Sequence, residues 1–151
     1  MFQDSVTIDN RHKRFVKTVA KTEIVYSLKN KKGYATTTSV QFEDSNGNPL
    51  SMLCFWSERA RAKSCIINEW KKYNVVEIGL AEFLESWCIG MAKDDWLVGT
   101  QFDQNMFGYE TDPLELILEI ARELEEIRKQ PTFINFDSLV DLKNTINEII
   151  H

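Results

Sequence analysis

The chain has 151 residues, of which 43% are hydrophobic and 27% are charged. These ordinary globular values exclude a disordered chain, and the length suits one domain that needs no disulfide or metal to hold its core. The net charge of −5 argues against nucleic-acid binding over the whole surface. Basic residues gather in residues 1–35 and acidic ones in residues 110–127. We favour two separate solvated surfaces over a direct contact between these regions.

The first half of the chain predicts one helix followed by three strands. A basic amphipathic helix is expected near residues 10–22, with His12 on its solvated face. Alternating residues predict strands over 23–30 and 33–42, which a short turn separates. The next strand, over 50–56, is apolar on both faces, which predicts a central position in the sheet.

The following stretch predicts helices and strands in alternation. A helix capped by Ser57 is expected over 58–72, and a second helix over 80–91. Strands are expected over 74–80 and 95–102.

The last quarter of the chain is helical. Asp112 followed by Pro113 predicts the start of a helix, which Pro131 ends. A final amphipathic segment over 137–150 carries four apolar residues at helical spacing, Leu139, Leu142, Ile146 and Ile149. We favour docking of this segment on its own chain, and a homodimer through the C-terminal helix stays open.

This element order predicts an α+β fold. Three successive strands joined by short turns favour an antiparallel or mixed sheet of about five strands, with helices mainly on one face. We expect residues 1–130 to form this single domain and residues 131–151 to form a C-terminal helical appendage.

The stretch FWSERARAKSCIINEW (55–70) carries the candidate binding residues Trp56, Arg59, Glu69 and Trp70. Arg59 stands in the first turn of the predicted helix, where a cation opposes the helix dipole. The end of a strand meets the start of a helix there, which suits anions. Arg59 either borders a functional recess or bridges to a carboxylate, such as one on the helix that follows Asp112. The tryptophans either fill the core or line a groove for a peptide or flat ligand.

The sequence carries no motif for a catalytic, metal or cofactor site. It has no phosphate-binding loop, dinucleotide glycine fingerprint, zinc-protease motif or nucleophile elbow. His12 sits in a basic run, where a solvated side chain is expected instead of a general base. Neither Cys nor His recurs at ligand spacing. We therefore predict no catalytic residue, no metal and no cofactor, and we favour a non-enzymatic protein over an enzyme.

Cysteine usage and apolar patterning predict the location. Cys54, Cys65 and Cys88 are odd in number and form no C-x-x-C pair, so they are expected to be reduced. The opening residues contain no signal-peptide-like apolar run, and no apolar run is long enough to span a membrane. These features predict a cytoplasmic protein.

Five spaced segments carry a family resemblance: FVKTVAKTEIVYSLKNKKGYAT, FWSERARAKSCIINEWKKY, IGLAEFLESW, LVGTQFD and FGYETDPLEL. They cover about residues 10–125 and resemble a bacterial family catalogued as domain of unknown function 2750. The turn around residues 43–49 is longer than is usual in that family, and the segment after Pro131 has no counterpart in it. The resemblance implies a small soluble bacterial domain. It transfers no catalytic residue, because the family has no established activity.

The preferred function is a non-enzymatic protein-binding or regulatory module of a bacterial cytoplasm, with toxin immunity as one form of it. The strand-FWS-helix layout is also similar to enhancer-of-secretion and immunity-type domains, which bind other proteins. We therefore expect another protein as the partner, and no membrane. The alternative is a small-molecule binder or weak enzyme with a cleft near Trp56, Arg59 and Trp70. Nucleic-acid binding is least favoured, because the chain is acidic.

Overall fold

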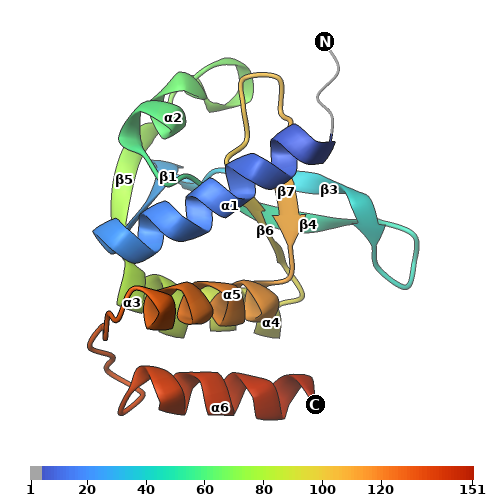
Figure 1. Ribbon diagram of the computed structural model, residues 1–151. Coiled ribbons are helices and arrows are strands. Elements are labelled where there is room, and N and C mark those ends of the chain that lie inside the picture. Colours follow the sequence, from blue (N-terminus) through green and yellow to red (C-terminus); the bar gives the residue numbers. More distant parts are fainter. Residues whose placement is uncertain (1–4) are drawn as a thin grey trace.

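The structure is a computed structural model that describes residues 5–151 (Figure 1). Its strands form two sheets, one with the order β2-β1-β5 and one with the order β3-β4-β6-β7. The strands are β1 (Ile24–Asn30), β2 (Gly33–Tyr34), β3 (Thr36–Glu43), β4 (Pro49–Phe55), β5 (Asn74–Gly79), β6 (Leu97–Thr100) and β7 (Tyr109–Thr111). The predicted α+β class with antiparallel or mixed strands is confirmed, although the strands are divided between two sheets.

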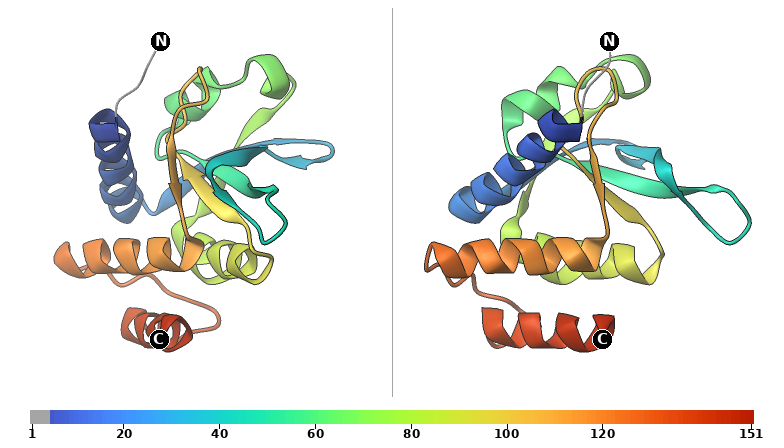
Figure 2. Two further views of the ribbon diagram at one scale, coloured as in Figure 1. Left: turned by 90° about the vertical axis from the view of Figure 1, so that its right-hand side faces the viewer. Right: turned by 45° about the vertical axis from the view of Figure 1, so that its right-hand side comes forward.

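The helices surround the sheets in layers. They are α1 (Ser5–Thr22), α2 (Arg59–Ser64), the 3₁₀-helix η1 (Asn68–Trp70), α3 (Leu80–Glu82), the π-helix η2 (Phe83–Cys88), α4 (Ile89–Lys93), α5 (Pro113–Glu126) and α6 (Leu139–Ile150). Figure 2 shows α1 on one side of the sheets and α5 beside the segment formed by α3, η2 and α4. The C-terminal helix α6 forms an outer layer beneath α5.

Strand β4 takes the central position that its apolar sequence predicts. It pairs antiparallel with β3 and parallel with β6, where Met52 lies opposite Leu97 and Phe55 opposite Thr100. A parallel pair needs a long crossover, and here the crossover contains α2, β5 and the segment from α3 to α4. Two backbone hydrogen bonds of 2.8 Å between Tyr26 and Trp56 connect β1 to the end of β4 and so join the two sheets.

The main core lies between the sheets, α1, α5 and η2. Phe55 of β4 meets Phe83 of η2 edge to face at 4.9 Å between ring centroids. Phe15 of α1 meets the same ring at 6.5 Å, and Ile117 and Ile120 of α5 are fully buried in this cluster. Burial of an apolar side chain of this size is worth about 1.5–3 kcal/mol, so this cluster is the main source of stability.

The helix predicted over 58–72 is wrong in length and in its cap. α2 ends at Ser64, Ile67 is extended with φ −143°, and Asn68 has φ 52°, so the chain leaves the helical conformation before η1 begins. Arg59 in α2 and Glu69 in η1 therefore do not belong to one continuous helix. The N-cap position is held by Glu58 without a side-chain cap bond. Ser57 instead hydrogen-bonds through its backbone and its hydroxyl to the side-chain amide of Gln101.

His12 was expected on a solvated face, and this expectation is wrong. Only 2% of the residue is exposed, because α1 buries a stripe that contains His12 together with Phe15, Val16 and Val19. This stripe packs against α5, so the basic N-terminal helix and the acidic α5 are in contact and are not two separate surfaces. His12 precedes Phe15, Val16 and Val19 by three, four and seven residues, and this spacing places it on the apolar face of the helix.

The C-terminal segment docks on its own chain in this structure. Leu139, Leu142 and Ile146 are fully buried in the main core, on the side of α6 that faces α5. Ile149 does not continue this seam as expected, since 59% of it is exposed. The segment before α6 is held by Glu85 of η2, whose carboxylate accepts hydrogen bonds from the backbone N–H groups of residues 134 and 135 at 2.8 and 2.7 Å.

Candidate functional site

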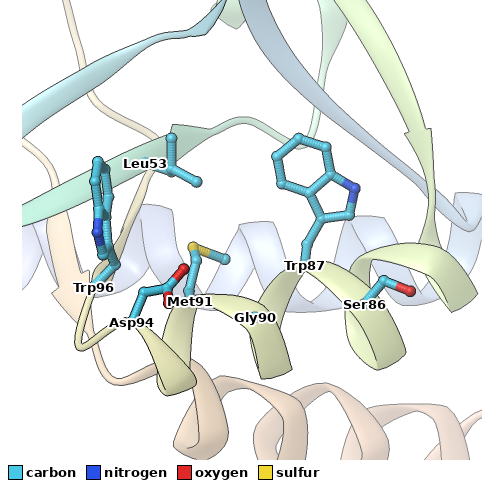
Figure 3. Close-up of a pocket in the computed structure, with 7 residues that line it drawn as sticks. All are labelled: Leu53, Ser86, Trp87, Gly90, Met91, Asp94 and Trp96. Atoms are coloured by element: carbon cyan, nitrogen blue, oxygen red, sulfur yellow. The ribbon is translucent and has the colours of Figure 1, made fainter.

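An apolar hollow opens between the helical segment η2–α4 and the face of β4. It is lined by Leu53, Ser86, Trp87, Gly90, Met91, Asp94 and Trp96, and we call it the tryptophan hollow (Figure 3). Its volume of about 420 Å³ falls near the lower end of the range of roughly 300–1,000 Å³ that is usual for ligand pockets. Figure 3 shows the two indoles standing at opposite ends, with Leu53 and Met91 between them.

The position of Trp87 is fixed by three contacts. Its ring meets Tyr34 of β2 edge to face at 4.6 Å between centroids and Phe55 of β4 at 5.8 Å. Its indole Nε1–H donates a hydrogen bond of 3.0 Å to the Glu82 carboxylate. The wide turn of the π-helix carries this residue, and such turns occur often at functional sites. These contacts orient Trp87 at one end of the hollow without any ligand.

The other wall is set by the turn that ends α4. The backbone N–H of Trp96 donates to the carbonyl of Met91 at 2.8 Å, and Asp95 adopts a left-handed conformation with φ 58°. This turn brings Trp96 back over the end of α4 and leaves Asp94 on the rim of the hollow. Both indoles are half-buried, so each keeps part of its surface exposed.

The four predicted binding residues are only partly brought together. Trp56 is fully buried and meets Trp70 edge to face at 5.9 Å. Trp70 and the exposed Glu69 line a second, smaller hollow of about 250 Å³. Arg59 lies apart from it on the surface, where its Nη2 pairs with Glu77 of β5 at 2.7 Å and its guanidinium lies over the Tyr26 ring. Arg59 therefore bridges to a carboxylate, but on β5 and not on the helix that follows Asp112.

This second hollow, which we call the loop hollow, lies between η1 and the loop from β6 to β7. Asp103, Gln104 and Met106 of that loop line it opposite Glu69 and Trp70. Asp103 pairs with Arg11 of α1 at 3.3 Å, which partly neutralises the acidic lining. The lining mixes polar and apolar groups, so the loop hollow suits a small polar ligand better than an apolar anchor.

The environment of His12 resembles a catalytic arrangement but is closed. Its Nε2 hydrogen-bonds to the Glu119 carboxylate of α5 at 2.7 Å, and its Nδ1 shares a hydrogen bond of 2.7 Å with the Thr100 hydroxyl. The ring stacks on Tyr109 at 3.9 Å. Burial, with the negative charge of Glu119, raises the pKa of the Tyr109 hydroxyl. Because Thr100 is fully buried, no substrate can reach its hydroxyl, and the group joins elements instead of catalysing a reaction.

From the sequence, Trp87 and Trp96 were expected either to fill the core or to line a groove, and the candidate site was placed at Trp56 and Trp70 instead. Trp87 stood on the predicted apolar face of its helix, and nothing in the pattern indicated that β4 would leave the space beside it open. The parallel pairing of β4 with β6, which places Leu53 over α4, had no signal in the sequence. Asn68 beside the loop hollow and Asp95 beside the tryptophan hollow adopt positive φ, a conformation in which asparagine and aspartate are enriched.

Residues 12–120 match the family described as "Protein of unknown function (DUF2750)". The chain belongs to this family. The match ends within α5, so the family region includes both hollows and leaves α6 outside. Searches of the curated proteins and of the solved structures gave no match. Across residues 5–151, no helix has both the length and the apolar character needed to cross a membrane.

Proposed function

We propose that this DUF2750 protein is a non-enzymatic protein-binding module of a bacterial cytoplasm, and that its partner docks in the tryptophan hollow. The observation that supports the proposal most is the combination of two half-buried indoles with an apolar base in an open hollow. Tryptophan is enriched among the residues that dominate binding energy at protein interfaces. A regulatory or toxin-immunity role is one form of this function.

The chemistry of the hollow favours docking over catalysis. Apart from the two indole N–H groups, its polar side chains are Ser86 and Asp94, and within residues 5–151 no second titratable side chain lines it. General acid–base catalysis needs positioned groups that converge on a reacting atom, and nucleophilic catalysis needs an activating base beside the nucleophile. The second candidate function, a small-molecule binder or weak enzyme, is supported by the mixed polar lining around Glu69 and Trp70 in the loop hollow.

Gly90 offers a direct way to test the docking proposal. It lies in α4 on the surface of the hollow, and a Cβ built on it meets no atom within 4 Å. Gly90→Leu should therefore fill the hollow without disturbing the core, and leucine also favours the helix by about 1 kcal/mol over glycine. The matched control is Gly79→Leu, because Gly79 is exposed at the end of β5 and has the same free space.

The experiment uses immobilised wild-type protein and both variants to capture partners from an extract of the source organism. A captured protein is then purified, and its dissociation constant is measured by calorimetry for each form. We expect Gly90→Leu to weaken binding at least about tenfold, since about 1.4 kcal/mol corresponds to a factor of ten. Gly79→Leu should bind like the wild type. Equal binding by all three forms contradicts docking in the tryptophan hollow.

A further inference from the structure

Within residues 5–151, one charged side chain lines the tryptophan hollow, that of Asp94. Asp94 lies on the rim, and Figure 3 shows its carboxylate directed toward the space between the indoles. Among the residues that the structure describes, this carboxylate has no hydrogen-bond or ion-pair partner, and no lysine or arginine lines the hollow. The hollow therefore presents a negative charge that the described part of the protein does not neutralise.

The walls of the hollow favour a cation independently of this carboxylate. An indole face carries the negative end of the ring quadrupole, and tryptophan is the strongest aromatic partner for a cation. Figure 3 shows the Trp96 ring edge-on, so that one of its faces is turned toward the space in front of Leu53 and Met91, and the Trp87 ring at the other end is already held in place. Leu53 and Met91 supply apolar surface between them, which suits the methylene stem of a long basic side chain.

We propose that the hollow receives an arginine side chain of the partner protein, an inference that rests on the protein-binding function proposed above. The guanidinium lies against an indole face and pairs with the Asp94 carboxylate, while its stem covers Met91 and Leu53. Arginine fits better than lysine because its planar group stacks on aromatic rings and donates two parallel hydrogen bonds to a carboxylate. The volume of about 420 Å³ suits one long side chain.

The test measures binding of acetyl-arginine methylamide to the full chain by following the indole N–H signals in nitrogen-15 NMR spectra. Acetyl-citrulline methylamide is the matched probe, because citrulline has nearly the same shape and no charge. We expect saturable shifts of the Trp87 and Trp96 signals in the millimolar range with the arginine probe, and binding at least about tenfold weaker with citrulline. Acetyl-leucine methylamide tests whether an apolar stem is sufficient.

Two variants locate the charge that matters. Asp94→Asn keeps the shape of the rim and removes its charge, so it should weaken the arginine probe about three- to tenfold. Asp95→Asn is the control, because Asp95 is exposed, does not line the hollow, and has a left-handed backbone that asparagine tolerates. This variant should bind the arginine probe like the wild type.

The outcomes separate this inference from the proposed function. If citrulline or leucine binds as well as arginine, or if Asp94→Asn binds the arginine probe unchanged, arginine recognition is wrong. The docking function still stands in that case if Gly90→Leu binds the captured partner more weakly than the wild type does. If no probe gives a saturable shift of either indole signal, arginine recognition is also wrong. The docking function fails by itself only if Gly90→Leu binds the captured partner as tightly as the wild type.

Discussion

His12 joins four elements through a single ring. It belongs to α1, its two nitrogens bond to Thr100 of β6 and Glu119 of α5, and its face stacks on Tyr109 of β7. Burial of a polar group costs little folding free energy when all of its hydrogen bonds are made. Loss of a partner leaves a buried donor or acceptor unpaired, which is costly. The residue that the sequence indicated as a solvated side chain is therefore part of the structural core.

Removal of this ring should destabilise the protein. We expect His12→Ala to lower the free energy of unfolding by about 2–4 kcal/mol, because it leaves Thr100 unpaired and opens a cavity beside Tyr109. Lys13→Ala is the control, since the adjacent Lys13 is exposed, and it should change the free energy by no more than about 0.5 kcal/mol. Urea unfolding measures both values, and equal stability of the two variants contradicts a structural role for His12.

The buried thiols should make the free energy of unfolding fall with increasing pH in the alkaline range. Burial raises the pKa of Cys54 and Cys88 well above the ordinary value of 9.0, with smaller contributions from nearby negative charges such as Asp112 beside Cys88. Above pH 9 the unfolded chain loses these thiol protons and the folded chain keeps them. The free energy of unfolding should therefore fall as the pH rises through about 9, by about 1.4 kcal/mol per pH unit for each thiol.

The variant Cys88→Ala isolates the contribution of one thiol. The cavity left by the substitution lowers stability at every pH. Above pH 9, however, the free energy of unfolding should fall less steeply with pH in the variant than in the wild type, because the contribution of one thiol is missing. Urea unfolding in reducing buffer at several pH values measures both slopes. Parallel curves for the wild type and the variant across the alkaline range contradict the raised thiol pKa.

At the scale of elements, apolar periodicity predicted most helices and strands but not the points where they break. The pattern of Leu80, Phe83 and Leu84 fits a regular α-helix, and nothing in it signals the π-helical turn that carries Glu85 inward. The predicted helix over 58–72 failed because Ile67 and Asn68 adopt non-helical conformations that tertiary packing selects. Such choices depend on contacts between distant segments, which a local pattern does not contain.

The docking of α6 can be tested with two residues from the same predicted seam. Leu142 is fully buried against the core, so Leu142→Ala should cost about 2–5 kcal/mol of unfolding free energy. Ile149 is exposed, so Ile149→Ala should cost no more than about 0.5 kcal/mol. Chemical denaturation measures both, and light scattering should give the same molar mass for the wild type and both variants. A dimeric wild type that Ile149→Ala makes monomeric contradicts docking on the same chain.

Glu85 should hold the segment before α6 in place. Glu85→Ala removes the acceptor for the backbone N–H groups of residues 134 and 135, which are bonded to it in the structure. We expect faster hydrogen exchange over residues 131–138 in this variant, while exchange in β4 stays as slow as in the wild type. Glu85→Gln keeps an oxygen acceptor and should show an intermediate effect. Unchanged exchange over 131–138 in both variants contradicts this tether.

At the scale of the whole molecule, the class of fold and the family were predictable, and the site was not. Strand and helix content follow from local periodicity, and the family follows from residues 12–120. The tryptophan hollow arises only when the parallel pairing of β4 with β6 sets Leu53 above the helical segment that carries Trp87 and Met91. Trp87 precedes α4 in the sequence and Trp96 follows it, and no recognised sequence motif marks the two residues as parts of one site.

Site-specific photo-crosslinking tests the central claim, docking of a partner in the tryptophan hollow, most directly. Ser86 is exposed on the rim of the hollow, and Asn144 is exposed on α6 away from it. A photoreactive benzoylphenylalanine is placed at one or the other position in the native host, and crosslinked proteins are identified by mass spectrometry. We predict that the partner captured by the wild-type protein crosslinks from position 86 and not from position 144. Crosslinking of that partner from position 144 alone would contradict the claim.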